Sequence, residues 1–573
     1  MRIRYQVMLL IVVVLGVYYP SLSAPLNSVD DPGMYSYLLN TDDFTLRGIF
    51  MPGGAYYRPL LLLSFLCDKY VWGLEVSFMH LDNILLHLCN VLLVYAITRR
   101  SCSLTGQQSR YIPLAAALLF ASHPINTESV IWISGRTDLL AGLFILLSVF
   151  LLLKRPLPFV NSLISACCLL LACLSKETAI FFLPAAVVIP FFLPADPVDA
   201  ATIGKTFRKY LLHGLVFGLV GAGYLLFRRF ALSGGDQGIA RVVTHVAGTQ
   251  SADVMISVQM VFKAIGFYAK KLVMPFPLNF GIVHVSDIYI LLGVTLSVCI
   301  VWFVTRRRSL TCYFFISALS IASSTVLILL LRITWTPLAE RYMYIPAAFF
   351  VVGSALAIQQ WRHYQYYHTQ LAAIAGVITA MALYGTFTRN LLWQDNLGLY
   401  QDTVRKSPGF MPAQNELANA LKEHGRTDEA LAIYKTFQLR NDVLNSQYAM
   451  LNKAGAFADI DDYDQARGIL KGVLNNPGRH EASILLKMLE INKIQLLRGK
   501  ATSAALYDNN VTCLTRLYEI TKDPFYQYRL GIVHLQENNR QKALDAFTIV
   551  GKTAPQEIYY RKPAEKLAKD LAK

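Results

Sequence analysis

Long apolar runs separated by short polar connectors fill the first two-thirds of the 573-residue chain. An apolar run of about 18 residues or more is typical of a membrane-spanning helix. Runs of this kind, some of them shorter, lie near 5–22, 78–98, 111–122, 137–153, 157–174, 178–194, 210–227, 287–305, 310–331, 342–360 and 368–388. The pattern predicts an all-α, polytopic membrane domain of about eleven spans over residues 1–389.

The connectors also indicate an orientation, because basic residues gather on the cytoplasmic side of a membrane protein. Arg2 and Arg4 place the N-terminus in the cytoplasm, and later basic clusters, such as 99–100 and 154–155, then fall inside by alternation. The cluster 306–308 falls inside only if the lysine-bearing stretch 258–274 lies along the outer interface or re-enters the membrane. The last span therefore ends outside.

The first run could also be read as a signal peptide, because two arginines precede it and "SLSA" (21–24) resembles a cleavage site. More spans follow it and the cleavage site is weak. We therefore expect an uncleaved first span.

The chain changes character near residue 390, where the spans stop and charges of both signs appear. Segments 415–437, 461–477 and 528–555 share the spacing of tetratricopeptide (TPR) repeats, with small residues at Ala430 and Ala543. The pattern predicts an extracytoplasmic C-terminal TPR α-solenoid over residues 390–573. An unrelated helical tail is the alternative.

The composition agrees with a membrane protein, with 54% hydrophobic and 16% charged residues. The net charge of +16 resides largely in clusters at the ends of apolar runs, and no basic-aromatic module is present, so we expect no nucleic acid partner. The nine cysteines have no CxxC pair or regular spacing, which argues against a disulfide framework or a zinc site.

Polar residues at the ends of apolar runs are candidates for function, because each is costly unless it is buried and paired. The loop after the first run holds Asp30 and Asp31, followed by Arg58, and could also be a plain solvated loop with helix caps. His80, Asn83, His87 and Asn90 form a polar stripe on one helix face, for which interhelical hydrogen bonding is the alternative.

Two more clusters fall on the same, outer side in this topology. The first is the connector 122–142, and the second joins the span ends near 176 and 340. Their charged and titratable members are His123, Glu128, Arg136, Asp138, Lys176, Glu177, Glu340 and Arg341. Arg136 and Asp138 could also be a simple helix cap with an ion pair.

Carboxylates, cations and aromatic residues thus meet at one membrane face. Arginine and lysine suit a phosphate group, and a carboxylate suits activation of an acceptor hydroxyl. A membrane setting suits a substrate carried on an isoprenoid chain. These parts together predict sugar transfer from a polyprenyl-phosphate-linked donor.

Several stretches carry a family resemblance. They are "VDDPGM", "HLDNILLHLCNVLLVYAI", "SHPINTESVIWISGRTDLLAGLFILLSVFLL", "LSKETAI" and "LAERYMYIP", followed by the repeats. This set resembles the transmembrane-and-TPR O-mannosyltransferases, members of the GT-C class of integral-membrane glycosyltransferases. The resemblance covers most of the chain in the same order, and the block around 122–152 is its most specific part.

The resemblance implies transfer of mannose or another hexose to a protein Ser or Thr hydroxyl, or to a glycan. It places Asp30 and Asp31 at the catalytic centre, one of them as the base. The sequence itself favours Asp31, because Pro32 would hold its backbone extended. Arg58, Arg136, Lys176 and Arg341 are the expected ligands of the carrier phosphate. The remaining charged and histidine residues of the clusters are candidates for donor binding.

The short repeat array and the lack of an ER-retention signal indicate a bacterial inner-membrane protein. No cofactor is certain, and a divalent cation, Mg²⁺ or Mn²⁺, is an open expectation. The expected partners are the lipid-linked sugar, a protein or peptide held by the repeats, and the bilayer. A non-catalytic membrane scaffold and a lipid-carrier transporter are the alternatives to an enzyme.

Overall fold

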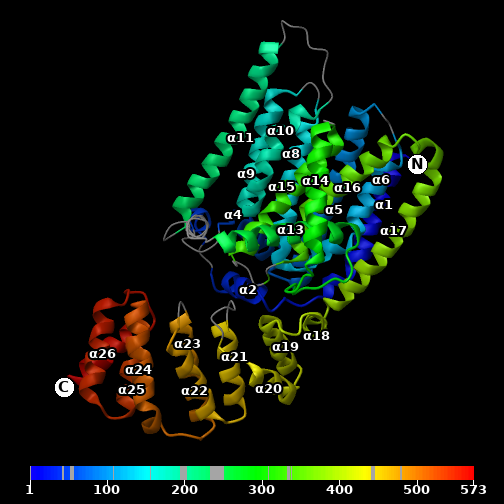
Figure 1. Ribbon diagram of the computed structural model, residues 1–573. Coiled ribbons are helices and arrows are strands. Elements are labelled where there is room, and N and C mark those ends of the chain that lie inside the picture. The colour runs from blue at the N-terminus through cyan, green and yellow to red at the C-terminus, as the bar shows by residue number, and fades with distance from the viewer. Residues whose placement is uncertain are drawn as a thin grey trace. The chain divides into compact units, whose positions relative to one another are not determined.

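A computed structural model describes residues 2–41, 44–51, 57–106, 109–154, 157–193, 203–232, 251–306, 309–331, 336, 338–439, 446–477 and 480–572. Tyr56 and three arginines of the predicted basic clusters, at positions 155, 307 and 308, lie outside the described residues. The described chain is helical, with one isolated bridge between Ile282 and Leu338, which confirms the all-α prediction (Figure 1). It divides into two compact units, Met1–Ser407 and Pro408–Lys573.

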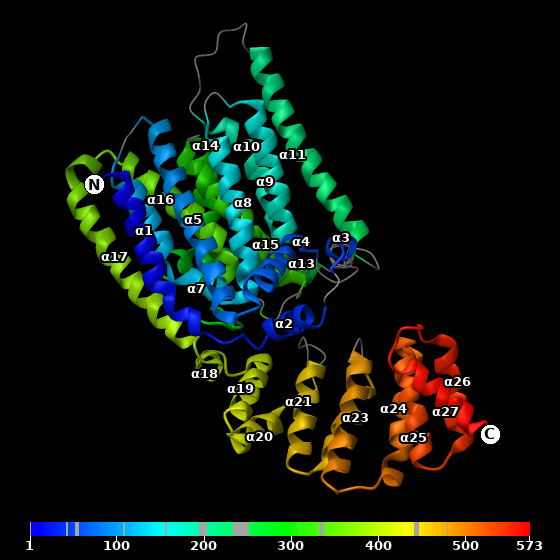
Figure 2. The ribbon, with the colours of Figure 1, turned by 180° about the vertical axis from the view of Figure 1, so that it is seen from behind.

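The first unit is built of helices, of which the long ones lie side by side (Figures 1 and 2). They are α1 (Ile3–Tyr18), α2 (Asp31–Asn40), α3 (Leu46–Phe50), α4 (Pro59–Cys67), α5 (Val76–Leu104), α6 (Ile112–Ser122), α7 (Thr127–Ile131), α8 (Arg136–Leu152), α9 (Phe159–Ser175), α10 (Leu183–Val188), α11 (Ile203–Ala231), α13 (Ser251–Val273), α14 (Ile288–Arg306), α15 (Leu310–Leu331), α16 (Tyr344–Gln360), α17 (Tyr364–Leu392) and α18 (Asn396–Lys406). Short helical turns join them: η1 (Tyr19–Ser23), η2 (Asp68–Trp72), η3 (Pro124–Asn126), η4 (Ile133–Gly135), η5 (Glu177–Phe182), η6 (Ile189–Phe191) and η8 (Glu340–Met343).

Six helical segments among the described residues are long and apolar enough to cross a membrane: Ile3–Ser23, Val76–Leu104, Ile133–Leu152, Arg208–Ala231, Glu340–Gln360 and Tyr364–Leu392. The other five predicted runs form shorter apolar helices: Ile112–Ser122, Phe159–Ser175, Glu177–Phe191, Ile288–Phe303 and Leu310–Val326. The chain is a multi-pass membrane protein. The total of about eleven crossings stays a prediction.

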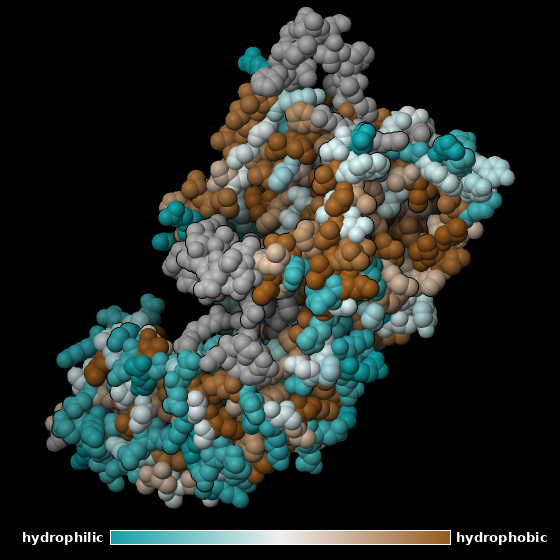
Figure 3. All heavy atoms as spheres, in the orientation of Figure 1, coloured by the Kyte–Doolittle hydropathy of each residue, from teal (hydrophilic) through white to brown (hydrophobic). Residues whose placement is uncertain are grey.

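The surface of the first unit supports this assignment. Helix α17 exposes Ile374, Val377, Met381 and Tyr384, each more than half accessible. Figure 3 shows broad apolar surface over the first unit, whereas the second unit is mainly hydrophilic. A contiguous apolar surface of this kind is what a lipid-facing helix presents.

Helix α13, which contains most of the stretch 258–274, packs backbone to backbone on α14. A Cβ atom added to Gly266 would lie 2.1 Å from the Tyr289 carbonyl oxygen, and one added to Gly293 would lie 1.9 Å from that of Phe262. Only glycine permits this approach. The contact holds α13 along α14. The expectation that this stretch lies along the outer interface or re-enters the membrane stays a prediction.

The second unit is a succession of helices, each packed on the next (Figure 2). They are α19 (Met411–Glu423), α20 (Thr427–Thr436), α21 (Ser446–Asp459), α22 (Tyr463–Leu474), α23 (Glu481–Leu497), α24 (Ser503–Thr521), α25 (Pro524–Gln536), α26 (Arg540–Thr553) and α27 (Arg561–Leu571). Ala430, Ala466 and Ala543 are buried where paired helices approach. Helical hairpins of this kind agree with the repeat pattern, and their assignment as TPR units stays a prediction.

The division between the units falls at 407/408, later than the boundary expected from the end of the apolar runs at 389/390. Helix α18 accounts for the difference, because its side chains bond to the first unit. Asn396 donates to the Leu26 carbonyl (3.0 Å), the Tyr400 and Ser28 hydroxyls lie 2.8 Å apart, and Lys406 donates to the Leu278 carbonyl (2.6 Å). Hydropathy alone does not reveal such contacts.

Candidate active site

The connector between α6 and α8 organises the polar groups of the first unit. It folds as η3, α7 and η4, three short turns whose residues are almost all buried. Buried polar groups need partners, and those in this connector find them on segments far away in the chain. The connector therefore fixes the loops that carry the predicted site residues.

Asp31 is held by this connector. Its side chain is 1% exposed and accepts three hydrogen bonds: from the Asn27 N–H (2.9 Å), the Ser134 N–H (3.1 Å) and the Ser134 hydroxyl (2.5 Å). Burial raises its pKa to about 6, although the bonds from Ser134 and Asn27 oppose that shift. Asp31 is also the first residue of α2, so the expectation that Pro32 keeps it extended is wrong.

Asp30 differs from its neighbour. It is exposed and precedes α2 as its N-cap, but its side chain makes no capping hydrogen bond. Its pKa is raised because surrounding protein displaces water, while the positive charges of Arg341 and Arg58 oppose the shift. Asp30 is thus the accessible member of the acidic pair, and its carboxylate lies near two guanidinium groups.

Arg58, just before α4, forms a bidentate ion pair with Glu177. Its Nε and Nη2 atoms donate to the two carboxylate oxygens at 2.8 and 2.6 Å. The side chain of Arg58 remains 25% exposed. The planar fork of arginine matches a carboxylate or phosphate in this way, and the exposed part of Arg58 can meet a ligand.

Lys176, between α9 and η5, donates to Asp138 at 2.6 Å, and both side chains are buried. The second oxygen of Asp138 has no hydrogen bond within the described part of the chain. Burial lowers the pKa of Lys176, Asp138 opposes this, and the charges of Arg58 and Arg341 lower it further. Lys176 therefore lies in the electrostatic field of the Arg58 and Arg341 guanidinium groups.

Arg341 pairs with the Glu128 carboxylate and stacks against aromatic rings. Its guanidinium carbon lies 4.9 Å from the ring centres of both Trp132 and Tyr342, and its side chain is 11% exposed. Glu128 also accepts from the backbone N–H groups of Glu340 (3.1 Å) and Arg341 (3.2 Å). Burial raises the pKa of Glu128, and Arg341 opposes the shift.

Glu340, the neighbour of Arg341, faces a different partner. It accepts from Lys271 at 2.7 Å and from the Asn279 N–H at 3.0 Å, and it is buried. This ion pair ties η8 to the end of α13. We call the set Asp30, Arg58, Lys176 and Arg341, with the partner carboxylates Glu177, Asp138 and Glu128, the acid–cation cluster.

Arg136 does not belong to the acid–cation cluster. It donates to Asp68 (2.6 Å), Asn83 (2.8 Å) and the Met79 carbonyl (2.8 Å), and its guanidinium carbon lies 4.8 Å from the ring centre of Phe65. The side chain is 1% exposed, so Arg136 joins helices instead of presenting donors to a phosphate. Its partner is Asp68, not Asp138, and burial raises the pKa of Asp68 to about 7.

The histidines of the predicted set also bond to protein groups. His80 lies 3.1 Å from the Ala24 carbonyl, His87 lies 2.8 Å from the Tyr344 hydroxyl, and His123 lies 3.0 Å from the Leu272 carbonyl. Asn83 and Asn90 likewise donate to carbonyls of the connector and of α8. The polar stripe on α5 therefore makes interhelical hydrogen bonds, the alternative left open by the sequence.

The structure separates the predicted residues into two groups. Asp30, Arg58, Glu128, Asp138, Lys176, Glu177 and Arg341 share the acid–cation cluster, whereas Asp31, His80, His87, His123, Arg136 and Glu340 hold segments together. Trp132 and Tyr342 join the cluster as stacking partners that polar patterns do not reveal. Among the described residues, no group of three or more His, Cys, Asp or Glu side chains is placed to hold a metal ion, and the divalent cation stays a prediction.

The fold and this cluster define a multi-pass helical membrane protein with a charged, loop-built site beside its spans. Part of the chain is similar to curated protein O-mannosyl-transferases. It is 36% identical to TMTC1 of Mus musculus over 164 residues (26% of this chain, 17% of the relative), and 45% identical to TMTC2 of Mus musculus over 99 residues (17% and 11%). It is 43% identical to TMTC4 of Homo sapiens over 102 residues (16% and 14%).

These matches confirm the resemblance to transmembrane-and-TPR O-mannosyltransferases over part of the chain. The matched segments cover less than a fifth of the length of each of these relatives. No family model matches the chain. No solved structure matches it either.

Proposed function

We propose that the protein is a glycosyltransferase that moves a sugar from a lipid-phosphate carrier to a Ser or Thr hydroxyl of a protein. The observation that carries the proposal is the contrast within the acidic pair: Asp31 is buried under three hydrogen bonds, while Asp30 is exposed beside Arg58 and Arg341. The similar proteins are protein O-mannosyl-transferases, which supports this reaction and mannose as the sugar.

In this proposal Asp30 is the base. Its carboxylate takes the proton of the acceptor hydroxyl as the hydroxyl oxygen attacks C1 of the sugar, and the bond from C1 to the phosphate oxygen breaks. The configuration at C1 inverts, and the carrier leaves as a phosphate monoester with its added negative charge. A raised pKa suits Asp30 to this task, because a stronger base accepts a proton more readily.

The cations of the cluster would receive the carrier phosphate. Arg58 and Arg341 keep 25% and 11% of their side chains exposed while paired with carboxylates, so each can meet a phosphate without first losing its partner. Lys176 is more deeply buried and contributes positive potential. Arginine gives the directional contacts that a phosphate requires.

The wider setting of the proposal follows the sequence pattern. The site faces the outside of a bacterial inner membrane, the N-terminus is cytoplasmic, the donor is a polyprenyl phosphate, and the second unit binds the acceptor as a TPR array in the periplasm. A concave helical array offers a surface for an extended peptide. A non-catalytic scaffold with the same units would bind the peptide but transfer no sugar.

The decisive experiment incubates the purified full-length protein with dolichyl- or undecaprenyl-phosphate mannose and a Ser/Thr-rich peptide, with and without EDTA. Asp30→Asn should lower the transfer rate by about 10²–10⁴-fold. Glu75→Gln, which removes another exposed carboxylate of the first unit, is the matched control and should transfer normally. Full activity of a folded Asp30→Asn protein would refute the base assignment, and no transfer by the wild type with either donor would favour the scaffold.

A further inference from the structure

Helix α18 bonds to two loops of the first unit that are far apart in the chain. Its first residue, Asn396, donates to the Leu26 carbonyl at 3.0 Å, in the loop that leads to the acidic pair. Directly after its last residue, Ser407 donates to the Gly281 carbonyl at 2.7 Å, in the segment between α13 and α14. One helix therefore joins these two loops.

Tyr400, in the middle of α18, bonds to the turn that immediately precedes Asp30. Its side chain is fully buried, and its hydroxyl lies 2.8 Å from the Ser28 hydroxyl and donates to Asn27 Oδ1 at 3.3 Å. The same Asn27 oxygen accepts from the Val29 N–H at 3.1 Å. A single buried hydroxyl thus holds the turn that carries Asp30.

The ring of Tyr400 is linked to Arg341, the cation next to Asp30. The ring centre lies 6.3 Å from that of Phe280, and Phe280 meets Trp132 edge to face with ring centres 5.7 Å apart. Trp132 is one of the two rings against which Arg341 stacks. Packed aromatic rings of this kind have little freedom to move, because the interior is close-packed. The ring of Tyr400 therefore supports the stack of Arg341.

The segment between α13 and α14 gives a second connection from α18 to Arg341. The Asn279 N–H donates to Glu340 at 3.0 Å, and Glu340 directly precedes Arg341. The side-chain amide of Asn279 donates to Ser407 at 3.0 Å. Since the turn before Asp30 and the segment beside Arg341 both bond to α18, the separation of these two charged groups depends on that helix.

Proton transfer and phosphate binding at one sugar require this separation to be correct. A displacement of about 1 Å can lower the rate of a reaction between positioned groups by about 10²-fold. The side chain of Asp30 is exposed and makes no capping hydrogen bond, so its position depends on its backbone. That backbone is held by the turn to which Tyr400 bonds.

We propose that Tyr400 is a positioning residue for sugar transfer: its hydroxyl fixes the turn that carries Asp30, and its ring supports the aromatic stack of Arg341. Because Tyr400 is fully buried, it acts through these neighbours and not on the substrate. The inference rests on the proposed function, but the hold of Tyr400 on the turn can be tested without a substrate.

The test compares Tyr400→Phe with Tyr95→Phe in the purified full-length protein, with dolichyl- or undecaprenyl-phosphate mannose and a Ser/Thr-rich peptide. Tyr400→Phe removes the hydroxyl and keeps the ring. We expect kcat per folded protein to fall about ten- to hundredfold, with the KM of the donor nearly unchanged because the stack of Arg341 remains.

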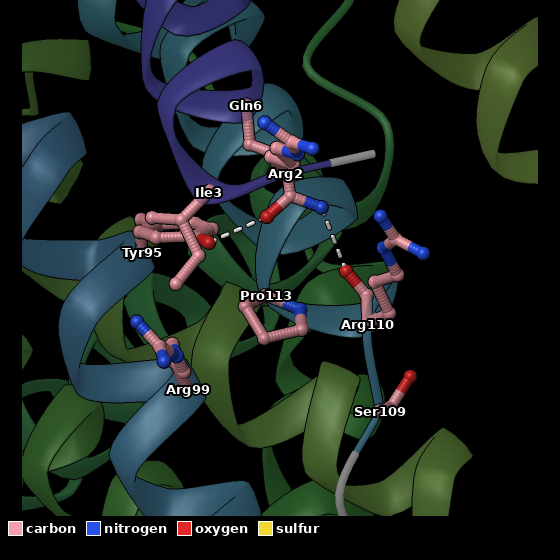
Figure 4. A pocket seen from close by; sticks show the side chains of 8 residues that line it. All are labelled: Arg2, Ile3, Gln6, Tyr95, Arg99, Ser109, Arg110 and Pro113. Carbon is pink, nitrogen blue, oxygen red and sulfur yellow. Dashed lines mark hydrogen bonds between the residues drawn. The ribbon is translucent and has the colours of Figure 1, made fainter.

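Tyr95 is the matched control. Its hydroxyl is also within the first unit and donates to Gln6 at 2.5 Å, a contact between α5 and the start of α1 that Figure 4 shows. Tyr95→Phe removes the same group from a buried side chain that does not bond to the turn before Asp30. It should therefore leave kcat at the wild-type value.

Two further measurements examine the contact itself. Ser28→Ala removes the other hydroxyl of the 2.8 Å contact, so Tyr400→Phe/Ser28→Ala should be no slower than Tyr400→Phe alone. Hydrogen exchange of the Val29 amide needs no substrate. It should be about fivefold faster in Tyr400→Phe, as for the loss of one hydrogen bond, and unchanged in Tyr95→Phe.

A folded Tyr400→Phe protein with wild-type kcat, or equal losses in Tyr400→Phe and Tyr95→Phe, would overturn the proposal in favour of a tyrosine that only fills the core. If the wild type transfers no sugar, the positioning role falls with the proposed function, whereas faster exchange at Val29 would still support the hold on the turn. Unchanged exchange at Val29 would refute that hold. Ser28→Ala, which changes a partly buried side chain, repeats both measurements if Tyr400→Phe misfolds.

Discussion

In the first unit, Arg136 and Asp68 lie 2.6 Å apart with almost no exposed surface. In the second unit, Lys487 and Glu490 lie 2.8 Å apart with 24% and 54% of their side chains exposed. The geometry of the two pairs is alike, but the surroundings are opposite. One pair joins segments 68 positions apart, and the other joins neighbouring turns of α23.

The comparison shows what charge does in each unit. Taking two ions out of water costs several kcal/mol per ion, so a buried pair persists only with close geometry and further hydrogen bonds, as at Arg136. Exposed pairs are screened by water and contribute about 0–1 kcal/mol. Charges of the first unit therefore define which segments meet, whereas charges of the second unit mainly keep its surface hydrated.

The largest expected effect follows from breaking the buried pair. Arg136→Gln leaves the Asp68 carboxylate without its cation and should lower the free energy of unfolding by about 3–5 kcal/mol. Unfolding in mixed micelles with increasing SDS measures the loss. Arg136→Met combined with Asp68→Leu should recover part of it, since no charge is then left unpaired.

A loss of less than about 1 kcal/mol in the free energy of unfolding of Arg136→Gln would contradict the structural role of the buried pair. The pH gives an independent check. Because the pKa of Asp68 is about 7 even with Arg136 present, removal of the arginine should raise it further. The loss should therefore be larger at pH 8, where Asp68 is charged, than at pH 6, where it binds a proton.

A smaller effect is expected at the contact that separates Asp31 from Asp30. Ser134→Ala removes the hydroxyl that donates to Asp31 at 2.5 Å and should cost about 1.5–3 kcal/mol above pH 6, as for hydrogen bonds to charged groups. The pKa of Asp31 is about 6, above its ordinary value, so ionised Asp31 weakens the fold at higher pH and protonation relieves this as the pH falls.

The loss in Ser134→Ala should accordingly shrink as the pH falls through 6, because protonated Asp31 depends less on the donated bond. Unfolding titrations of the variant and the wild type at several pH values measure this difference. Ser129→Ala, which changes another serine of the same connector, is the control. A loss that does not vary with pH would show that Ser134 acts through packing alone.

Much of the fold could be predicted from the sequence, because apolar runs and repeat spacing are local signals. Each predicted run overlaps an apolar helix, and the change in pattern near 390 lies close to the division at 407/408. The later boundary depends on side chains of α18 that bond to Leu26 and Leu278, and such contacts leave no periodic trace.

The site could be predicted only as a set of residues, not as a set of pairs. The sequence places Arg136 two positions before Asp138, but the structure pairs Arg136 with Asp68 and Asp138 with Lys176. The restriction that Pro32 places on its neighbour favours Asp31 as the base. In the structure, however, the distant Ser134 donates a hydrogen bond to the Asp31 carboxylate. The packing of the helices determines which side chains become partners. The order of residues along the chain does not reveal that packing.

The smallest effect is expected for the exposed ion pair between Lys487 and Glu490 in α23. Glu490→Gln removes the partner of Lys487 and should destabilise α23 by about 0.2–1 kcal/mol at low salt, because water already screens the pair. Hydrogen exchange of the α23 amides in the full-length protein measures this change. Since the Debye length falls to about 3 Å at 1 M salt, the difference from the wild type should vanish there. A loss as large as that of Arg136→Gln, or one that high salt leaves unchanged, would remove the distinction between the two units and assign the second one buried electrostatics of its own.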